Sequence, residues 1–190
     1  MATIQILNKE TLSERKYKLQ YITFEKPDME GKFHNQENEV YFRPDAVSVL
    51  LADEKQQKLL LTRQFRLPAF LNGNDSGYLV ETCAGLIDEG ETEEQAARRE
   101  VEEETGYQIN DLNKIGGVYT SAGGITEFVH LFIANYNHGD QYGQGGGKEG
   151  EAEDIELIEM EFNDAREKLK QGWFIDAKTI MLLQHFFLNR

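Results

Sequence analysis

Apolar and polar residues alternate along two short segments near the start of the chain, and a period of two is typical of β-strands. In residues 16–24, KYKLQYITF, Tyr17, Leu19 and Tyr21 fall on one face, and residues 38–43, NEVYFR, predict a second strand. A turn-rich connection separates the two. We therefore predict a small β domain over residues 1–45. It has few bulky residues to bury, and because isolated hairpins are marginally stable we expect it to dock on another surface.

From residue 46 onward the apolar runs are more continuous, which predicts strands in the core of a sheet. AVSVLLA and KLLLTRQF, joined by the polar DEKQQ, are the first two. Turn-forming segments such as SAGGIT separate later strands. The strands predicted in this region cover residues 46–52, 58–65, 78–85, 112–120, 126–135 and 155–162.

Other segments carry helical signals. Thr92 opens a capping box for a helix over residues 93–105, and Gly106 is the natural stop. Residues 163–172 predict a second helix, and Asp176 is expected to cap a third. Strands and helices alternate without regular βαβ spacing. We therefore predict an α/β fold in which a mixed sheet carries helices on both faces.

Composition narrows the function classes. The net charge of −14 argues against binding to nucleic acid or to an anionic membrane surface, because both need basic patches. Cys83 is the single cysteine, so no intramolecular disulfide can form and a reducing compartment fits. The chain begins without the pattern of a signal peptide and has no apolar run of membrane-spanning length. We therefore expect a soluble cytoplasmic protein.

Acidic residues crowd one segment in particular. From Asp88 to Glu104 there are nine acidic and two basic side chains. Residues three and four apart share a helix face, so Glu100, Glu103 and Glu104 project together and repel, by about 0.2–0.5 kcal/mol per pair. One interpretation is a solvated helix face. The other is a platform for a hard divalent cation such as Mg²⁺, which takes oxygen ligands and keeps waters that substrate phosphates can replace.

The spacing around these glutamates resembles the Nudix box: Gly, five residues, Glu, seven residues, Arg-Glu, an apolar residue, any residue, Glu-Glu, any residue, Gly and a hydrophobic residue. The resemblance implies an α/β/α sandwich over residues 46–190 and hydrolysis of a nucleoside diphosphate linked to another moiety. The residues that fill the pattern are Gly85, Glu91, Arg99, Glu100, Val101, Glu103, Glu104, Gly106 and Tyr107.

The same resemblance implies roles for the box. Glu100, Glu104 and the backbone carbonyl of Ala84 are expected to bind Mg²⁺, for which Mn²⁺ can substitute. Glu103 is a metal ligand in some members and a partner of Arg99 in others, and it is one of two candidate catalytic residues here. Arg99 is expected to orient the glutamates.

Further motifs outside the box, among them RQFR, ETCAGLID and SAGGITE, resemble the branch that acts on nucleotide sugars and ADP-ribose, and in particular the GDP-mannose pyrophosphatase subfamily. That subfamily implies a homodimer in which the N-terminal β domains are exchanged. One departure stands out: the stretch before Glu39 is NQEN, where the subfamily has basic residues. The residues expected at the substrate are Glu39, Arg66, Gly85, Glu127 and Lys178.

The loop YGQGGGKEGEAED, residues 142–154, is interpreted as flexible because of its glycines. By resemblance to the ADP-ribose branch, Glu151 is the second candidate catalytic residue, as a general base, and Glu153 is a late metal ligand. Two alternatives stay open: the segment is a disordered acidic loop, or the metals activate water unaided.

Together these features predict Mg²⁺-dependent hydrolysis of the diphosphate bond of a nucleoside diphosphate sugar, with GDP-mannose giving GMP and mannose 1-phosphate. ADP-ribose, or a broad range of nucleotide sugars, is the alternative substrate. A non-enzymatic nucleotide-sugar sensor is the rival class, but such proteins usually lose box glutamates or add a DNA-binding domain, and this chain keeps the complete box.

Overall fold

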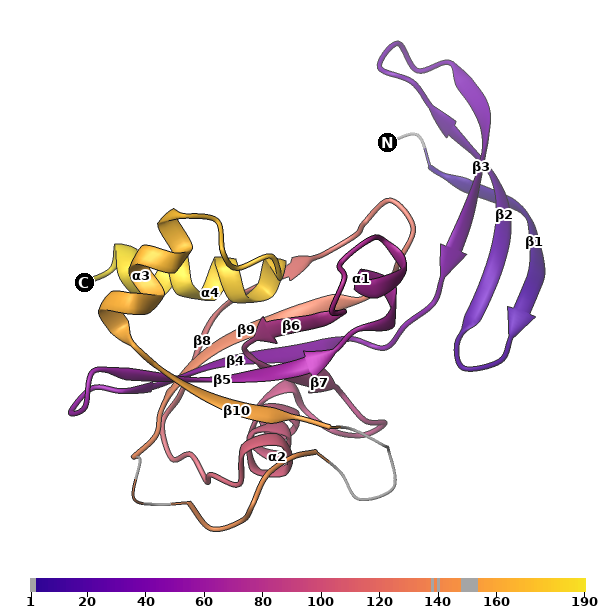
Figure 1. Ribbon diagram of the computed structural model, residues 1–190. Coiled ribbons are helices and arrows are strands. Elements are labelled where there is room, and N and C mark those ends of the chain that lie inside the picture. Colours follow the sequence, from indigo (N-terminus) through magenta and orange to yellow (C-terminus); the bar gives the residue numbers. More distant parts are fainter. Residues whose placement is uncertain (1–2, 138, 140, 148–153) are drawn as a thin grey trace. The chain divides into compact units, whose positions relative to one another are not determined.

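The computed structural model describes residues 3–137, 139, 141–147 and 154–190 (Figure 1). Contacts divide the chain into two compact units. The first contains Met1–Asp45 together with Tyr119–Phe128, and the second contains Ala46–Val118 together with Val129–Arg190. The assignment of residues 1–45 as a domain stays a prediction. Within the described residues, no helix combines the length and the apolar character that a membrane span needs.

The first unit is a three-stranded antiparallel sheet, in which β2 (Lys18–Pro27) lies between β1 (Gln5–Glu14) and β3 (Phe33–Tyr41). Strand β1 was not predicted, because it is exposed along almost its whole length and shows no clean alternation. The segment 119–128 joins this sheet where the Tyr41 amide donates to the carbonyl of Gly124 at 2.8 Å. The N-terminal antiparallel sheet that the sequence predicts is therefore present, with one strand more than expected.

The second unit is built on a mixed sheet of order β10-β5-β4-β9-β8, with β6 paired to β5 and β7 to β4. Its central pair, β4 and β9, is parallel, whereas β5 and β7 run antiparallel to β4. The prediction of a mixed sheet is confirmed. The strands are β4 (Ala46–Asp53), β5 (Lys58–Phe65), β6 (Tyr78–Glu81), β7 (Cys83–Leu86), β8 (Leu112–Tyr119), β9 (Phe128–Asn135) and β10 (Glu156–Glu161).

Residues 78–85 do not form the single strand that was predicted. The chain breaks at Thr82, so that β6 pairs with β5 while β7 crosses to β4. Continuous apolar character cannot reveal such a change of partner, because both halves, apart from the exposed Tyr78, are buried or half-buried. The consequence is that Glu81 and Ala84, three residues apart, belong to different strand pairs.

Helices cover both faces of this sheet, as predicted (Figure 1). Helix α2 (Glu93–Thr105) lies on one face, while α3 (Phe162–Lys170) and α4 (Ala177–Leu188) lie on the other. The short α1 (Leu67–Leu71) was not predicted. The fully buried residues of α2 and β4 pack into one apolar cluster that fixes the helix on the sheet. They are Val47, Val49, Leu51, Ala96, Ala97 and Val101.

The ends of α2 agree with the sequence analysis. The Thr92 hydroxyl accepts from the Gln95 amide at 3.3 Å, and the Gln95 side chain accepts from the Thr92 amide at 2.9 Å, which completes the capping box. Gly106 ends the helix in the left-handed conformation, with φ of 75°. The box glutamates are therefore placed on a helix whose start and end are both fixed locally.

Candidate metal and catalytic site

Helix α2 carries its acidic face toward strand β7. Glu104 is 4 % exposed, and its Oε2 accepts a hydrogen bond from the Ala84 amide at 3.2 Å. The side chains of Glu100 and Glu103 are 14 % and 29 % exposed. The structure therefore brings together the box glutamates and the strand whose Ala84 carbonyl was predicted as a ligand.

Arg99 connects the carboxylates of this face. Its guanidinium holds Glu91 with two hydrogen bonds, of 2.9 and 2.8 Å, and donates from Nη1 to Glu100 at 2.7 Å and to Glu103 at 3.1 Å. It also donates to the Leu86 carbonyl at 2.9 Å. These partners, Glu91 first, raise the pKa of Arg99 against the opposing effect of burial. The positive charge of Arg99 thus offsets the repulsion expected among the glutamates of this helix face.

Gly85 of β7 lies directly against the Glu100 side chain of α2. A Cβ atom at this position would lie 2.0–2.3 Å from the carboxylate atoms of Glu100. Only a residue without a side chain leaves room for that carboxylate. The box therefore requires glycine at this position for a steric reason. Any side chain would displace the carboxylate of Glu100, which is a predicted metal ligand.

The donor set suits a hard divalent cation, because every side chain in it offers carboxylate oxygen. Within the part of the chain that the structure describes, however, no three metal-ligating side chains are already gathered around one point. Glu100 and Glu103 are directed at Arg99 instead. Each carboxylate can accept several bonds, so contact with Arg99 and binding of a cation are compatible. The residues present fit Mg²⁺ in their chemistry.

Cys83 precedes Ala84 on β7 and is buried. Burial, together with the neighbouring Glu104, raises the pKa of its thiol well above the usual value. The thiolate is the reactive form of cysteine, so this side chain stays a neutral, inert part of the core.

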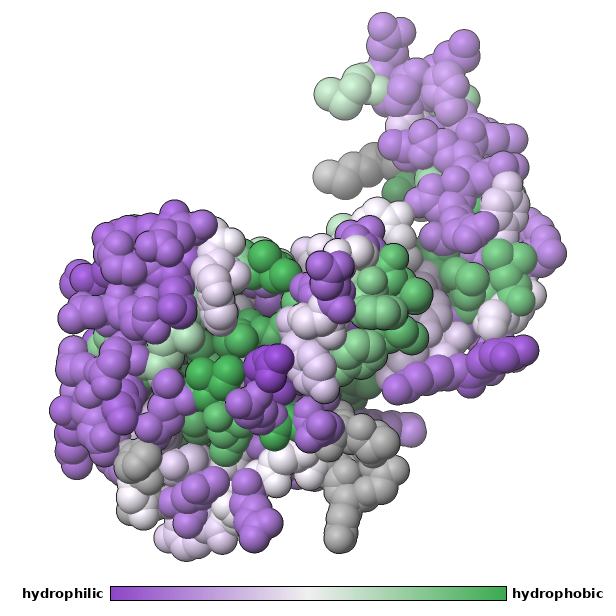
Figure 2. Space-filling model, in the orientation of Figure 1, coloured by the Kyte–Doolittle hydropathy of each residue, from purple (hydrophilic) through white to green (hydrophobic). Residues whose placement is uncertain are grey.

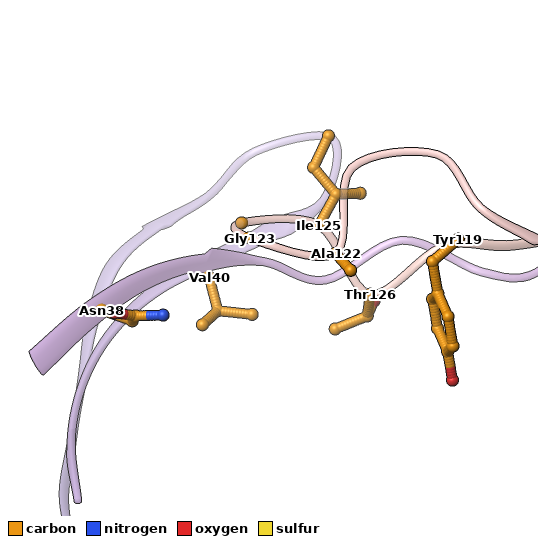
Figure 3. A pocket seen from close by; sticks show the side chains of 8 residues that line it. Asn38, Val40, Tyr119, Ala122, Gly123, Ile125 and Thr126 are labelled. Carbon is orange, nitrogen blue, oxygen red and sulfur yellow. The ribbon is translucent and has the colours of Figure 1, made fainter. Parts of the chain in front are cut away.

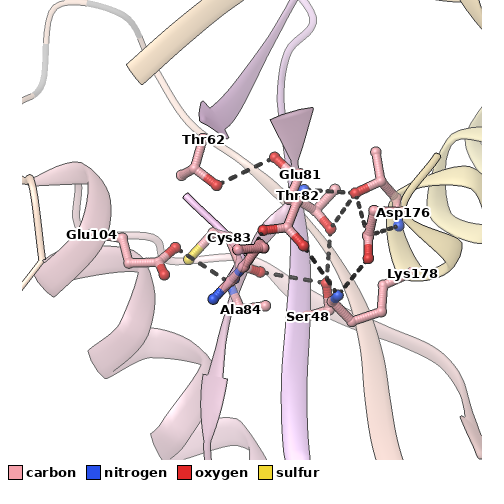
Figure 4. A network of polar contacts seen from close by, with 11 residues as sticks. Ser48, Thr62, Glu81, Thr82, Cys83, Ala84, Glu104, Asp176 and Lys178 are labelled. Carbon is pink, nitrogen blue, oxygen red and sulfur yellow. Dashed lines mark hydrogen bonds and ion pairs between the residues drawn. The ribbon is translucent and has the colours of Figure 1, made fainter. Parts of the chain in front are cut away.

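Arg66 and Lys178 meet at one buried carboxylate, that of Glu81. Arg66 Nε donates to Glu81 Oε2 at 2.7 Å. Lys178 Nζ lies 3.5 Å from Glu81 Oε1 (Figure 4). Lys178 also donates to Asp176 at 2.6 Å. The structure therefore brings together two of the residues predicted at the substrate. Sequence reasoning missed Glu81 as their common partner, although it stands inside the quoted ETCAGLID motif.

Comparison with known proteins identifies the family. Residues 42–183 match the NUDIX domain family. The chain belongs to the Nudix family. It is 42 % identical to a protein named GDP-mannose pyrophosphatase from Cronobacter sakazakii, and the alignment covers 98 % of this chain and 96 % of that protein. Proteins of the same name from Shigella flexneri and from Escherichia coli O157:H7 are 40 % identical with the same coverage.

A solved structure of an ADP compounds hydrolase has the same fold. It covers 98 % of this chain and 92 % of its own, with a TM-score of 0.71 at 21 % sequence identity. The predicted α/β Nudix fold and the predicted family are confirmed. With its complete box, the chain is a Nudix hydrolase.

Two further predicted residues of this Nudix hydrolase lie in the first unit. Glu127 pairs with Arg43, whose Nε lies 3.0 Å from Glu127 Oε1, and its side chain is 16 % exposed. Glu39 lies on β3 opposite Tyr21 and is exposed. A pocket of about 350 Å³ opens beside them, between Asn38 and Val40 of β3 and the segment 119–126 (Figure 3).

The glycine-rich segment after β9 approaches the end of the Nudix helix α2. The amides of Gly146 and Gly147 donate to the carbonyl oxygens of Glu104 and Glu103, at 2.8 and 3.2 Å. A Cβ atom on Gly145 would lie 2.6 Å from the Glu104 carbonyl oxygen. The flexible loop predicted for residues 142–154 stays a prediction; in its described part, residues 142–147, the glycines permit close packing against α2. Glu151 and Glu153 lie outside the described residues.

We predict that Gly85→Ala impairs metal-dependent turnover more than folding. The added methyl group would collide with the Glu100 carboxylate and force it away from β7. We expect the Mg²⁺ titration of activity to shift to higher concentration, while the urea midpoint changes little. Gly139→Ala is the matched control, because nothing lies within 4 Å of its added Cβ. Identical Mg²⁺ titrations for Gly85→Ala and wild type would contradict the role of Gly85.

Proposed function

We propose that this Nudix hydrolase cleaves the diphosphate bond of a nucleoside diphosphate sugar, with GDP-mannose giving GMP and mannose 1-phosphate. The observation that carries the proposal is the complete box on α2, packed against β7, in a chain 40–42 % identical over nearly its full length to proteins named GDP-mannose pyrophosphatase. ADP-ribose is the second candidate, because the stretch NQEN lacks the basic residues that the subfamily has before Glu39.

Glu100, Glu104 and the Ala84 carbonyl are proposed to hold Mg²⁺. A bound cation would polarise the phosphates, position the attacking water and offset charge on the leaving phosphate. Arg66 and Lys178 are proposed to bind the diphosphate, which matches their charge and their half-buried position. In the overall reaction water adds to one phosphorus, and the bond from that phosphorus to the bridging oxygen breaks.

A base must take the proton of the attacking water. Glu103 accepts a hydrogen bond from Arg99 at 3.1 Å, so its carboxylate is already engaged by that guanidinium. This favours Glu151 as the proposed base, with Glu153 as an additional metal ligand. Glu39, Gly85 and Glu127 complete the proposed set of substrate contacts.

The proposed assembly is a homodimer formed through the N-terminal sheet. Charged and polar residues cover much of this sheet, yet apolar side chains are exposed on it as well (Figure 2). Exposed apolar surface of this kind is typical of an interaction surface. The exposed apolar residues of the sheet and its ends are Ile4, Ile6, Leu7, Leu12, Met29 and Phe33.

The function is tested by product analysis over a panel that includes GDP-mannose, other GDP- and UDP-sugars and ADP-ribose, each with Mg²⁺. We expect GMP and mannose 1-phosphate to appear at the highest kcat/KM. A preference for ADP-ribose would support the second candidate. Absence of cleavage across the panel would refute both, since a competent Nudix hydrolase of this specificity must release a nucleoside monophosphate.

We predict that Glu104→Gln lowers kcat about 10³-fold, which corresponds to the loss of about 4 kcal/mol of stabilisation in the transition state. The substitution keeps the shape of the side chain and removes the charge that a cation needs. Glu102→Gln is the control on the same helix, because the Glu102 side chain accepts from Gln108 rather than facing β7. Near-wild-type turnover of Glu104→Gln would exclude the metal platform.

We predict that Ile6→Asp combined with Leu12→Asp shifts the protein from dimer to monomer in sedimentation velocity runs. Both side chains are exposed on β1, so the substitutions place charge on the proposed interface without disturbing a core. Asn8→Asp on the same strand adds a charge at a polar position and should leave the dimer intact. A wild-type protein that sediments as a monomer at all concentrations would refute the assembly.

We predict that Glu151→Gln lowers kcat about 10²–10⁴-fold, the range of general base catalysis, and leaves KM nearly unchanged. Glu153→Gln should instead raise the Mg²⁺ concentration that half-maximal activity requires. The two variants control for each other, since a general effect of the segment would give both the same phenotype. Wild-type turnover and metal titration in both would remove these residues from the site.

A further inference from the structure

Lys178 stands where helix electrostatics disfavour it. It is the second residue of α4, and the first turn of a helix carries partial positive charge from its unpaired amides. A cation there is repelled unless nearby anions compensate. Asp176 and Glu81 supply that compensation, at 2.6 and 3.5 Å from Lys178 Nζ. The side chains of Asp176 and Glu81 therefore hold the Lys178 amine in place, although the helix dipole repels it.

The Asp176 carboxylate binds two partners at once, the Lys178 amine and the first turn of α4. Its Oδ1 accepts from Lys178, while its Oδ2 accepts from the amide and the hydroxyl of Thr179 at 2.9 and 2.8 Å (Figure 4). Although burial opposes ionisation, Lys178 and the Thr179 bonds outweigh it and lower the pKa of Asp176. The carboxylate is thus fixed by the first turn of α4 and has little freedom to follow Lys178 if the amine moves.

The same cap is connected to the strand that leads to the metal platform. The Thr179 hydroxyl accepts from the Thr82 amide at 2.8 Å, and both residues are buried. Thr82 also contacts the Ser48 hydroxyl of β4 at 2.8 Å. Two residues further along the chain, Ala84 donates to Glu104. An unbroken series of short contacts therefore joins the start of α4 to the box glutamates.

We propose that Asp176 is a positioning residue that aims the Lys178 amine and fixes its place relative to β7. The inference rests on the proposed function, in which Lys178 binds the diphosphate. Before substrate arrives, Arg66 and Lys178 are balanced by Glu81 and Asp176, so the pair of cations is kept in place without a bound anion. Such preorganisation lowers the cost of ordering the site when substrate binds.

A double-mutant cycle tests this coupling. Asp176→Asn keeps a good helix cap but removes the charge opposite Lys178. We expect it to lower kcat/KM about 10- to 10²-fold, the scale of a misplaced catalytic contact. In a Lys178→Met background the same substitution should cost nothing further, because the residue through which Asp176 acts is gone. Equal losses in both backgrounds would overturn the proposal.

A second measurement does not depend on activity. Lysine acetylation followed by mass spectrometry should label Lys178 several-fold faster in Asp176→Asn than in wild type. Asp164→Asn is the matched control, because Asp164 forms a solvent-exposed pair with Lys168 on α3 and should alter neither Lys178 labelling nor turnover. Asp176→Ser, another good cap without charge, should repeat the result if the asparagine variant folds poorly.

The two measurements separate the possible failures. If no nucleotide sugar is cleaved by wild type but Lys178 labelling rises in Asp176→Asn, the proposed function fails while the positioning of Lys178 stands. If wild type cleaves GDP-mannose and neither activity nor labelling responds to Asp176→Asn, the proposed function stands and the positioning role is refuted.

Discussion

The approach of an acidic helix face to strand β7 is the constraint on which the site depends. Three glutamates on one helix face repel each other, and a cation among them offsets that repulsion. Arg99 supplies that charge within the chain, since its guanidinium holds Glu91, Glu100 and Glu103 together. The absence of a side chain at Gly85 removes the steric obstacle on the opposite side. Charge and shape therefore act together: Arg99 offsets the repulsion among these glutamates, and Gly85 leaves room for the Glu100 carboxylate.

The short segment from Glu81 to Ala84 links two chemically different parts of the second unit. At one end Glu81 joins Arg66 to Lys178, and at the other Ala84 donates to Glu104. The break at Thr82 makes this possible, because it transfers the chain from β5 to β4 within a few residues. A continuous strand would have kept both ends on one partner. The irregularity in the sheet therefore places the partner of Arg66 and Lys178 and the partner of Glu104 on one short segment of the chain.

Glycines permit close packing against α2 at two places in this protein. Gly85 makes room for a carboxylate of α2, and Gly145 lets the segment after β9 lie against the last carbonyl groups of the same helix. Those carbonyls lack partners inside a helix, so the amides of Gly146 and Gly147 satisfy them. The composition of this glycine-rich segment is typical of a loose linker, but its described part is hydrogen-bonded to α2.

The sequence by itself determined what local rules control. The capping box and the stop at Gly106 delimit α2 because both depend on residues within one turn, and the shared face of Glu100, Glu103 and Glu104 follows from helical spacing alone. Most strands of the second unit follow from continuous apolar runs. Only the tertiary structure decided the rest. The exposed β1 shows no clean alternation to reveal it, and the meeting of Arg66 with Lys178 at Glu81 joins residues far apart in the chain. Such partners are chosen by packing between β5, β6 and α4, which no local pattern encodes.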